Sequence, residues 1–76
     1  MTTATKLTGH AESLRDMLAD LLLREPRRWD RYNRIVFRDG LDKRLLRPAF
    51  GAGPGYWMIT DKGVDTLHSL NNLEQP

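Results

Sequence analysis

Apolar residues recur at intervals of three and four between residues 9 and 24, which predicts an amphipathic helix over this range. Its apolar stripe consists of Ala11, Leu14, Leu18, Leu21 and Leu22. Glu12, Asp16 and Asp20 fall four residues apart on another face, and an acidic row of this kind is repelled by DNA. Pro26 cannot continue the helix. We therefore expect this helix to support the fold.

Residues 26–38, PRRWDRYNRIVFR, fit two patterns. In a helix with about 100° per residue, four arginines fall within about 60° of one another, opposite three apolar residues. The arginines are Arg27, Arg31, Arg34 and Arg38, and the apolar residues are Trp29, Tyr32 and Val36. In a strand, the run Ile35-Val36-Phe37 has the favoured composition, but polar and apolar residues alternate poorly. The helix is the preferred interpretation.

The remaining pattern predicts a hairpin between helices. After a break at Asp39-Gly40, residues 41–46 (LDKRLL) have the spacing of a short helix, which Pro48 ends. A short strand over residues 47–50, a glycine-rich turn over 51–55 and a strand over 56–59 follow. Thr60 then caps a last helix from Asp61 to about Leu70. We expect one domain over residues 9–71, between a flexible tail over 1–8 and a C-terminal tail over 72–76.

These periodicities predict a single hydrophobic core. Its expected members are Leu14, Leu18, Leu21, Trp29, Leu45, Trp57, Ile59, Val64 and Leu67. A chain of 76 residues is near the lower limit for a domain held by a core alone. The absence of cysteine excludes disulfides and predicts a reducing compartment, the cytoplasm. The longest apolar run, Leu21-Leu22-Leu23, is too short for a signal peptide or a membrane span.

Charge is unevenly distributed along the chain, although the net charge is only +2. Nine basic and four acidic residues lie between Arg24 and Arg47, so this segment carries +5 and the rest of the chain −3. Eight of the nine basic residues are arginine, whose planar guanidinium suits phosphates and carboxylates. The middle of the chain is therefore predicted to bind an anionic partner.

Several features of residues 41–70 occur together: the double leucine Leu45-Leu46, the hairpin over 47–59 and the turn Ile59-Thr60-Asp61-Lys62-Gly63. This combination resembles the second half of a winged-helix DNA-binding domain. That family usually has a glycine where this chain has Arg44, and it needs two helices between the first helix and the wing. About twenty residues are available for them, so either the recognition helix is compressed into residues 30–44 and interrupted at Gly40, or the wing stands on a different scaffold.

The resemblance implies a small α+β winged-helix-like domain, mostly helical, with a two-stranded β-hairpin wing. It implies a transcriptional regulator that binds double-stranded DNA, as a dimer to match half-site symmetry. The expected contact residues are Arg27, Arg28, Arg31, Arg34, Arg38, Lys43, Arg44, Arg47 and Tyr56. The alternative is a phage-encoded inhibitor or adaptor of the anti-defence type, which uses the same basic face on an acidic or nucleic-acid-binding surface of a protein.

Catalytic patterns are lacking. His10 and His68 lie far apart without metal-ligand spacing, and Ser13 and Ser69 lack the context of a nucleophile. A phosphate-binding loop requires a lysine and a following helix, and the glycine-rich segment 51–55 has neither. We expect no enzymatic activity, no metal and no cofactor.

Overall fold

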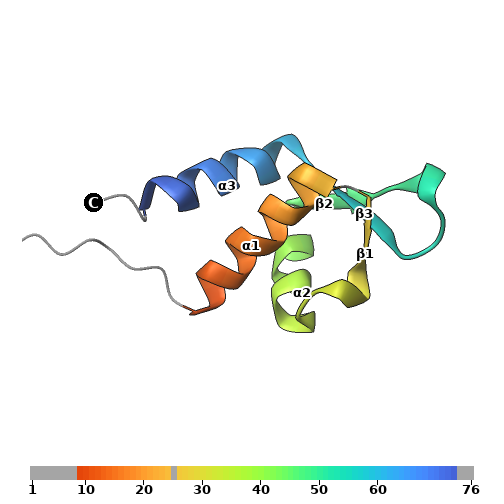
Figure 1. Ribbon diagram of the computed structural model, residues 1–76, viewed down its shortest axis with the longest axis horizontal. Helices are drawn as coiled ribbons and strands as arrows, with labels where there is room; N and C mark the ends of the chain where they lie inside the picture. Colours follow the sequence, from red (N-terminus) through yellow and green to blue (C-terminus); the bar gives the residue numbers. More distant parts are fainter. Residues whose placement is uncertain (1–8, 25, 74–76) are drawn as a thin grey trace, which may run out of the picture.

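The computed structural model describes residues 9–24 and 26–73, and this part of the chain is an α+β domain (Figure 1). Its helices are α1 (Gly9–Arg24), α2 (Arg34–Asp42) and α3 (Asp61–Leu73), with 3₁₀ turns η1 (Trp29–Arg31) and η2 (Phe50–Ala52). Its strands are β1 (Arg27–Arg28), β2 (Leu46–Pro48) and β3 (Tyr56–Ile59). The helices gather at one end, and the loop between β2 and β3 extends from the other (Figure 1). None of the described helices is both long and apolar enough to cross a membrane.

The sheet has three antiparallel strands in the order β1-β3-β2, so the prediction of a two-stranded hairpin is wrong. A hairpin is present, but its first strand covers residues 46–48 rather than the predicted 47–50, with Leu46 opposite Ile59. Arg27 also pairs with Trp57 on the other edge of β3. A central strand with one unpaired edge would expose a row of backbone donors and acceptors. The two-residue β1 pairs that edge, and this explains why Arg27–Arg28 is extended.

The predicted helix over residues 26–38 is wrong in its first half. The Trp29 amide donates to the Gly55 carbonyl at 3.0 Å, which fixes the chain after β1 against the hairpin. The Asn33 side chain then accepts from the amides of Ile35 and Val36 at 2.9 and 3.4 Å. An asparagine that satisfies these free amides begins a new helix, so α2 starts at Arg34.

The predicted break at Asp39-Gly40 and the predicted helix over residues 41–46 are also wrong. Helix α2 continues through Gly40, because this buried position packs against α1 and β2: a Cβ there would lie 3.0 Å from Met17 Cε. The helix ends at Asp42, and the Leu45 amide donates to the Gly40 carbonyl at 2.8 Å. Arg44 adopts a φ of 59° in this turn, the left-handed conformation that favours glycine. The resemblance places a glycine at this position.

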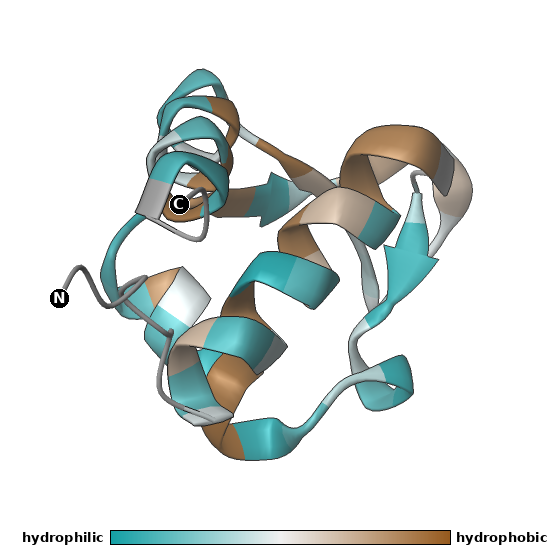
Figure 2. Cartoon of the chain, turned by 60° about the vertical axis from the view of Figure 1, so that its left-hand side comes forward, coloured by the Kyte–Doolittle hydropathy of each residue, from teal (hydrophilic) through white to brown (hydrophobic). Residues whose placement is uncertain are grey.

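The core lies between α1, α2, α3 and the sheet. Among the described residues it consists of Leu14, Met17, Leu18, Leu21, Val36, Phe37, Leu45, Leu46, Ile59 and Leu67. Trp57 and Val64 pack against it as predicted, and the Trp57 ring meets Phe37 edge-on with centroids 5.4 Å apart. The prediction is wrong for Trp29, which is 39% exposed, and the predicted stripe is wrong for Leu22, which is 44% exposed. In Figure 2 the last turn of α1 is hydrophobic and leads towards the hydrophilic β1.

Helix α3 begins as predicted and runs further than predicted. Thr60 Oγ1 accepts from the Gly63 amide at 3.0 Å and donates to the Arg44 carbonyl at 2.9 Å. This residue therefore caps α3 and also ties it to the turn after α2. The helix continues to Leu73, so the part of the predicted C-terminal tail over residues 72–73 is helical. The tail predicted over 1–8 and the rest of the C-terminal tail lie outside the described residues.

Candidate nucleic-acid interface

The nine predicted contact residues do not form one face. Three of the cations are already paired with carboxylates, and two of these pairs lie around β1 and η1. The pairs are Arg28 with Asp30 at 3.2 Å, Arg31 with Asp20 at 3.1 Å and Lys43 with Asp39 at 2.9 Å. Arg27 and Tyr56 are half-buried, and the Arg27 Nε is buried without a hydrogen-bond partner among the described residues. A phosphate would have to compete with the carboxylates for these paired cations.

Arg34 and Arg38 form the cationic part of the outward face of α2. They are four residues apart, so they lie one above the other on the helix, and both are exposed. Neither makes an ion pair or a side-chain hydrogen bond within residues 9–24 and 26–73. Val36 and Phe37, on the opposite side, are buried in the core. The core thus fixes the rotation of α2 and directs both free guanidinium groups to solvent.

Ile35 adds an apolar side chain to the same region of α2. It is 71% exposed beside Arg34, although isoleucine is among the residues most often buried. Asp42 lies one turn beyond Arg38 and is also exposed, so the positive charge of α2 is confined to its N-terminal half. An exposed isoleucine beside two free arginines is a combination that can contact both polar and methyl groups of a partner.

A second cationic group lies at the base of the hairpin. Arg44, Arg47 and Lys62 line a hollow of about 530 Å³ together with Thr60 and Asp61. The Thr60 amide donates to the Leu45 carbonyl at 2.9 Å, and this bond brings Lys62 beside the two arginines. Lys62 was not among the predicted contact residues, because its proximity to Arg44 and Arg47 depends on this tertiary hydrogen bond. Arg44 and Arg47 are exposed and form no ion pair among the described residues.

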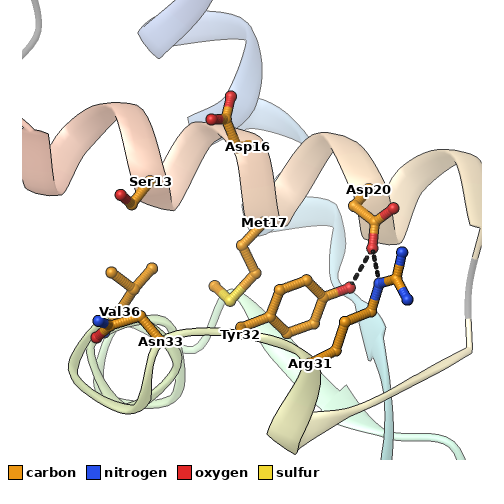
Figure 3. Close-up of a pocket in the computed structure, with 8 residues that line it drawn as sticks. All are labelled: Ser13, Asp16, Met17, Asp20, Arg31, Tyr32, Asn33 and Val36. Atoms are coloured by element: carbon orange, nitrogen blue, oxygen red, sulfur yellow. Dashed lines mark hydrogen bonds and ion pairs between the residues drawn. The ribbon is translucent and has the colours of Figure 1, made fainter.

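A hollow of about 490 Å³ lies between α1 and the η1–α2 segment (Figure 3). Tyr32 Oη and Arg31 Nε converge on it from one side, and both donate to Asp20 Oδ2, at 2.6 and 3.1 Å (Figure 3). The hydrogen bond from Tyr32, followed by that from Arg31, lowers the pKa of Asp20, although burial opposes the shift. Burial and the Asp20 carboxylate raise the pKa of Tyr32. This cluster holds η1 against α1, and it uses Arg31 to do so.

Replacing Asp20 with asparagine should reduce the acid sensitivity of the fold. The folded-state pKa of Asp20 is lowered, so its contribution is present above its unfolded pKa of about 4 and is lost as pH falls through the folded value. Asp20→Asn should therefore unfold at lower urea concentration at pH 7, with a smaller further loss below about pH 4. The control is Asp65→Asn, because this exposed carboxylate has no partner among the described residues. Equal acid sensitivity in Asp20→Asn and the wild type would contradict the assignment.

A second carboxylate connects the first turn of α1 to α2. His10 Nε2 lies 3.0 Å from Asp39 Oδ2, and Lys43 donates to the same oxygen. The hydrogen bonds from His10 and Lys43 lower the pKa of Asp39. No group of three or more histidine, aspartate or glutamate side chains in the described part of the chain is arranged to hold a metal ion. The His10–Asp39 contact is therefore a link between helices.

Comparisons with protein families, with curated proteins and with solved structures found no match for this chain. The features of the described chain that bear on function are therefore the order of its elements and its unpaired cations. Two groups of these cations are exposed: Arg34 and Arg38 on α2, and Arg44 and Arg47 after it.

Proposed function

We propose that this chain is a small winged-helix-type regulator that binds double-stranded DNA, with α2 as its recognition helix. The observation that carries the proposal is the outward face of α2, where Arg34 and Arg38 have no partner among the described residues and the opposite face is buried. Free arginines on a helix that the core holds in place can contact guanine edges and phosphates without first breaking an ion pair.

The element order supports this assignment. A helix-turn-helix has a helix before the recognition helix, and in this chain the three-residue 3₁₀ turn η1 stands before α2. Helix α2 occupies residues 34–42 without interruption and leads into the β2–β3 hairpin. This order supports the compressed alternative, with the differences that α2 begins at Arg34 and is not interrupted at Gly40. The left-handed Arg44 also stands where the winged-helix pattern has glycine.

The dimensions of α2 suit the major groove. An α-helix with its side chains is about 10–12 Å in diameter, and the major groove is about 12 Å wide, so the exposed face of α2 can enter it. Recognition helices read base edges mainly with their N-terminal residues. In α2 these include Arg34, which suits the two acceptors of guanine, and Ile35, which suits the methyl group of thymine. Arg38, one turn further on, is positioned for a phosphate or a second guanine.

Charge segregation supports the same orientation. Glu12 is an exposed acidic residue of α1, where Asp16 pairs with Arg15 at 3.1 Å, whereas the free arginines lie on α2 and around the base of the hairpin. A molecule with separated charges is oriented by the field of DNA before contact, because phosphates attract one face and repel another. The same field disfavours encounters in which α1 faces the DNA.

The direct test is a salt titration of wild-type protein with a labelled duplex of random sequence, followed by fluorescence anisotropy. On a duplex of random sequence the arginines contact the backbone rather than base edges, so four free arginines that neutralise four phosphates predict a log–log slope of about −4, since each phosphate contributes about −0.9. Lack of binding at about 50 mM salt, where non-specific electrostatic binding is strong, would contradict the proposal. The anionic partner would then be sought among acidic protein surfaces, the alternative that the sequence leaves open.

A further inference from the structure

Phe50 is an exposed aromatic residue at the tip of the hairpin. Its side chain is 89% exposed, the highest value among the exposed large apolar residues of the described chain. It opens the 3₁₀ turn η2, which lies at the end of the molecule away from the helices (Figure 1). Exposing a phenylalanine ring to water is unfavourable, and a partner that covers the ring would remove this cost.

The backbone around Phe50 is held by hydrogen bonds. The amide of the buried Ala49 donates to the Tyr56 carbonyl at 2.9 Å, and the Ala52 amide donates to the Ala49 carbonyl at 3.0 Å. Gly53 and Gly55 have φ values of 109° and 81°, which allow the chain to turn back into β3. The Trp29 amide also donates to the Gly55 carbonyl, which ties the loop to η1. The ring therefore projects from an ordered turn.

The tip carries no charge that could bind phosphates. Residues 48–55, PAFGAGPG, contain no lysine, arginine or histidine, and every side chain except those of Phe50 and the two prolines is small. The nearest free cation in sequence is Arg47 on β2. A narrow, uncharged tip on a cationic base can enter the minor groove, which is about 6 Å wide, while the base follows the backbone.

Phe50 also stands between two hollows. One, of about 330 Å³, is lined by Phe50 and Trp57, and the other, of about 530 Å³, by Phe50 and Met58. Neighbouring residues of a strand point to opposite faces, so Trp57 and Met58 place the hollows on opposite faces of the hairpin. The Phe50 ring borders both and remains available for a new apolar contact.

We propose that Phe50 acts as an apolar wedge that enters a base-pair step from the minor groove and bends the duplex. The inference rests on the proposed DNA binding and adds a residue and a deformation to it. Apolar side chains that enter the minor groove unstack the step and kink the duplex towards the major groove. Flexible pyrimidine–purine steps accept this deformation at the lowest cost. The wing then favours sequences with such a step beside the site of α2.

The test uses a duplex of about 20 base pairs with a central TA step, end-labelled for energy transfer and carrying 2-aminopurine at that step. Wild-type protein should shorten the end-to-end distance and raise the 2-aminopurine fluorescence. Phe50→Ala should lose both effects and bind on the order of tenfold more weakly. Phe50→Leu is the matched control, because leucine retains an apolar wedge, and it should keep both effects. The salt slope should be the same in all three proteins, since Phe50 is uncharged.

The outcomes separate this inference from the proposed function. If wild-type protein binds with a slope of about −4 but Phe50→Ala bends and unstacks the duplex equally, the wedge is wrong and DNA binding stands. If wild-type protein binds without bending or unstacking, the wedge is likewise wrong. Failure of wild-type protein to bind any duplex overturns both. Thermal melts check that the variants fold, which we expect because Phe50 is exposed.

Discussion

Gly63→Ala should destabilise the protein by at least about 2 kcal/mol. Gly63 is buried in the first turn of α3, and an added Cβ would overlap the Leu45 carbonyl oxygen and lie 2.6 Å from Ile59 Cγ1. The carbonyl cannot move freely, because it accepts from the Thr60 amide at 2.9 Å. Overpacking of this kind costs about 3 kcal/mol or more, and the better helix propensity of alanine returns about 1 kcal/mol. A domain of this size has little stability to lose.

Gly51→Ala is the matched control, since nothing lies within 4 Å of a Cβ at that position. Urea unfolding followed by tryptophan fluorescence should give a stability within about 0.5 kcal/mol of the wild type for Gly51→Ala and a much lower midpoint for Gly63→Ala. Equal midpoints would mean that the junction of α2, β3 and α3 is looser than described. Gly63 is also the glycine of the threonine-x-lysine-glycine turn, which is part of the winged-helix resemblance.

Elements with local signals were predicted well from the sequence. Helix α1 has the predicted bounds because its apolar spacing and Pro26 are both local features. Strand β3 also has its predicted bounds, and Thr60 caps α3 as expected. In each of these cases the residues that define the element lie within it or next to it. The length of α3 was underestimated, since its last turn contains no terminating residue that could be recognised.

Elements that depend on distant partners were not predictable in the same way. Arg27–Arg28 becomes a strand because β3, about thirty residues later, offers an unpaired edge. Gly40 resembles a breaker in the sequence, but its lack of a side chain allows α2 to approach Met17 closely. Asn33 is a residue type that often caps helices, and its side chain does so here. The cap was not predicted, because the arginine spacing continues across residues 26–38 and favoured one long helix.

The candidate site was predicted in part. The four-residue spacing identified Arg34 and Arg38 as one face, and the structure keeps them together on α2. Spacing could not show that Asp20 and Asp30 pair with Arg31 and Arg28, because these contacts depend on the turn η1. The exposure of Phe50 cannot be predicted from its sequence neighbours, since it follows from the conformation of the hairpin.

Arg34→Ala/Arg38→Ala should weaken binding to duplex DNA by roughly 30-fold or more at low salt, because each lost contact is worth about 1 kcal/mol or more. The double variant should also flatten the log–log salt slope by about two, one unit for each lost phosphate contact. Both side chains are exposed and without partners among the described residues, so the variant should melt at the same temperature as the wild type.

Arg28→Ala/Arg31→Ala removes the same charge from residues that are paired with Asp30 and Asp20. A salt titration of the wild type and both double variants against one duplex of random sequence, where the arginines contact phosphates, therefore compares two positions of the lost arginines at the same net charge. We expect the slope of about −4 to fall to about −2 for Arg34→Ala/Arg38→Ala and to change by less than about one for Arg28→Ala/Arg31→Ala. Equal slopes for the two variants would contradict the assignment of α2 as the helix that contacts DNA.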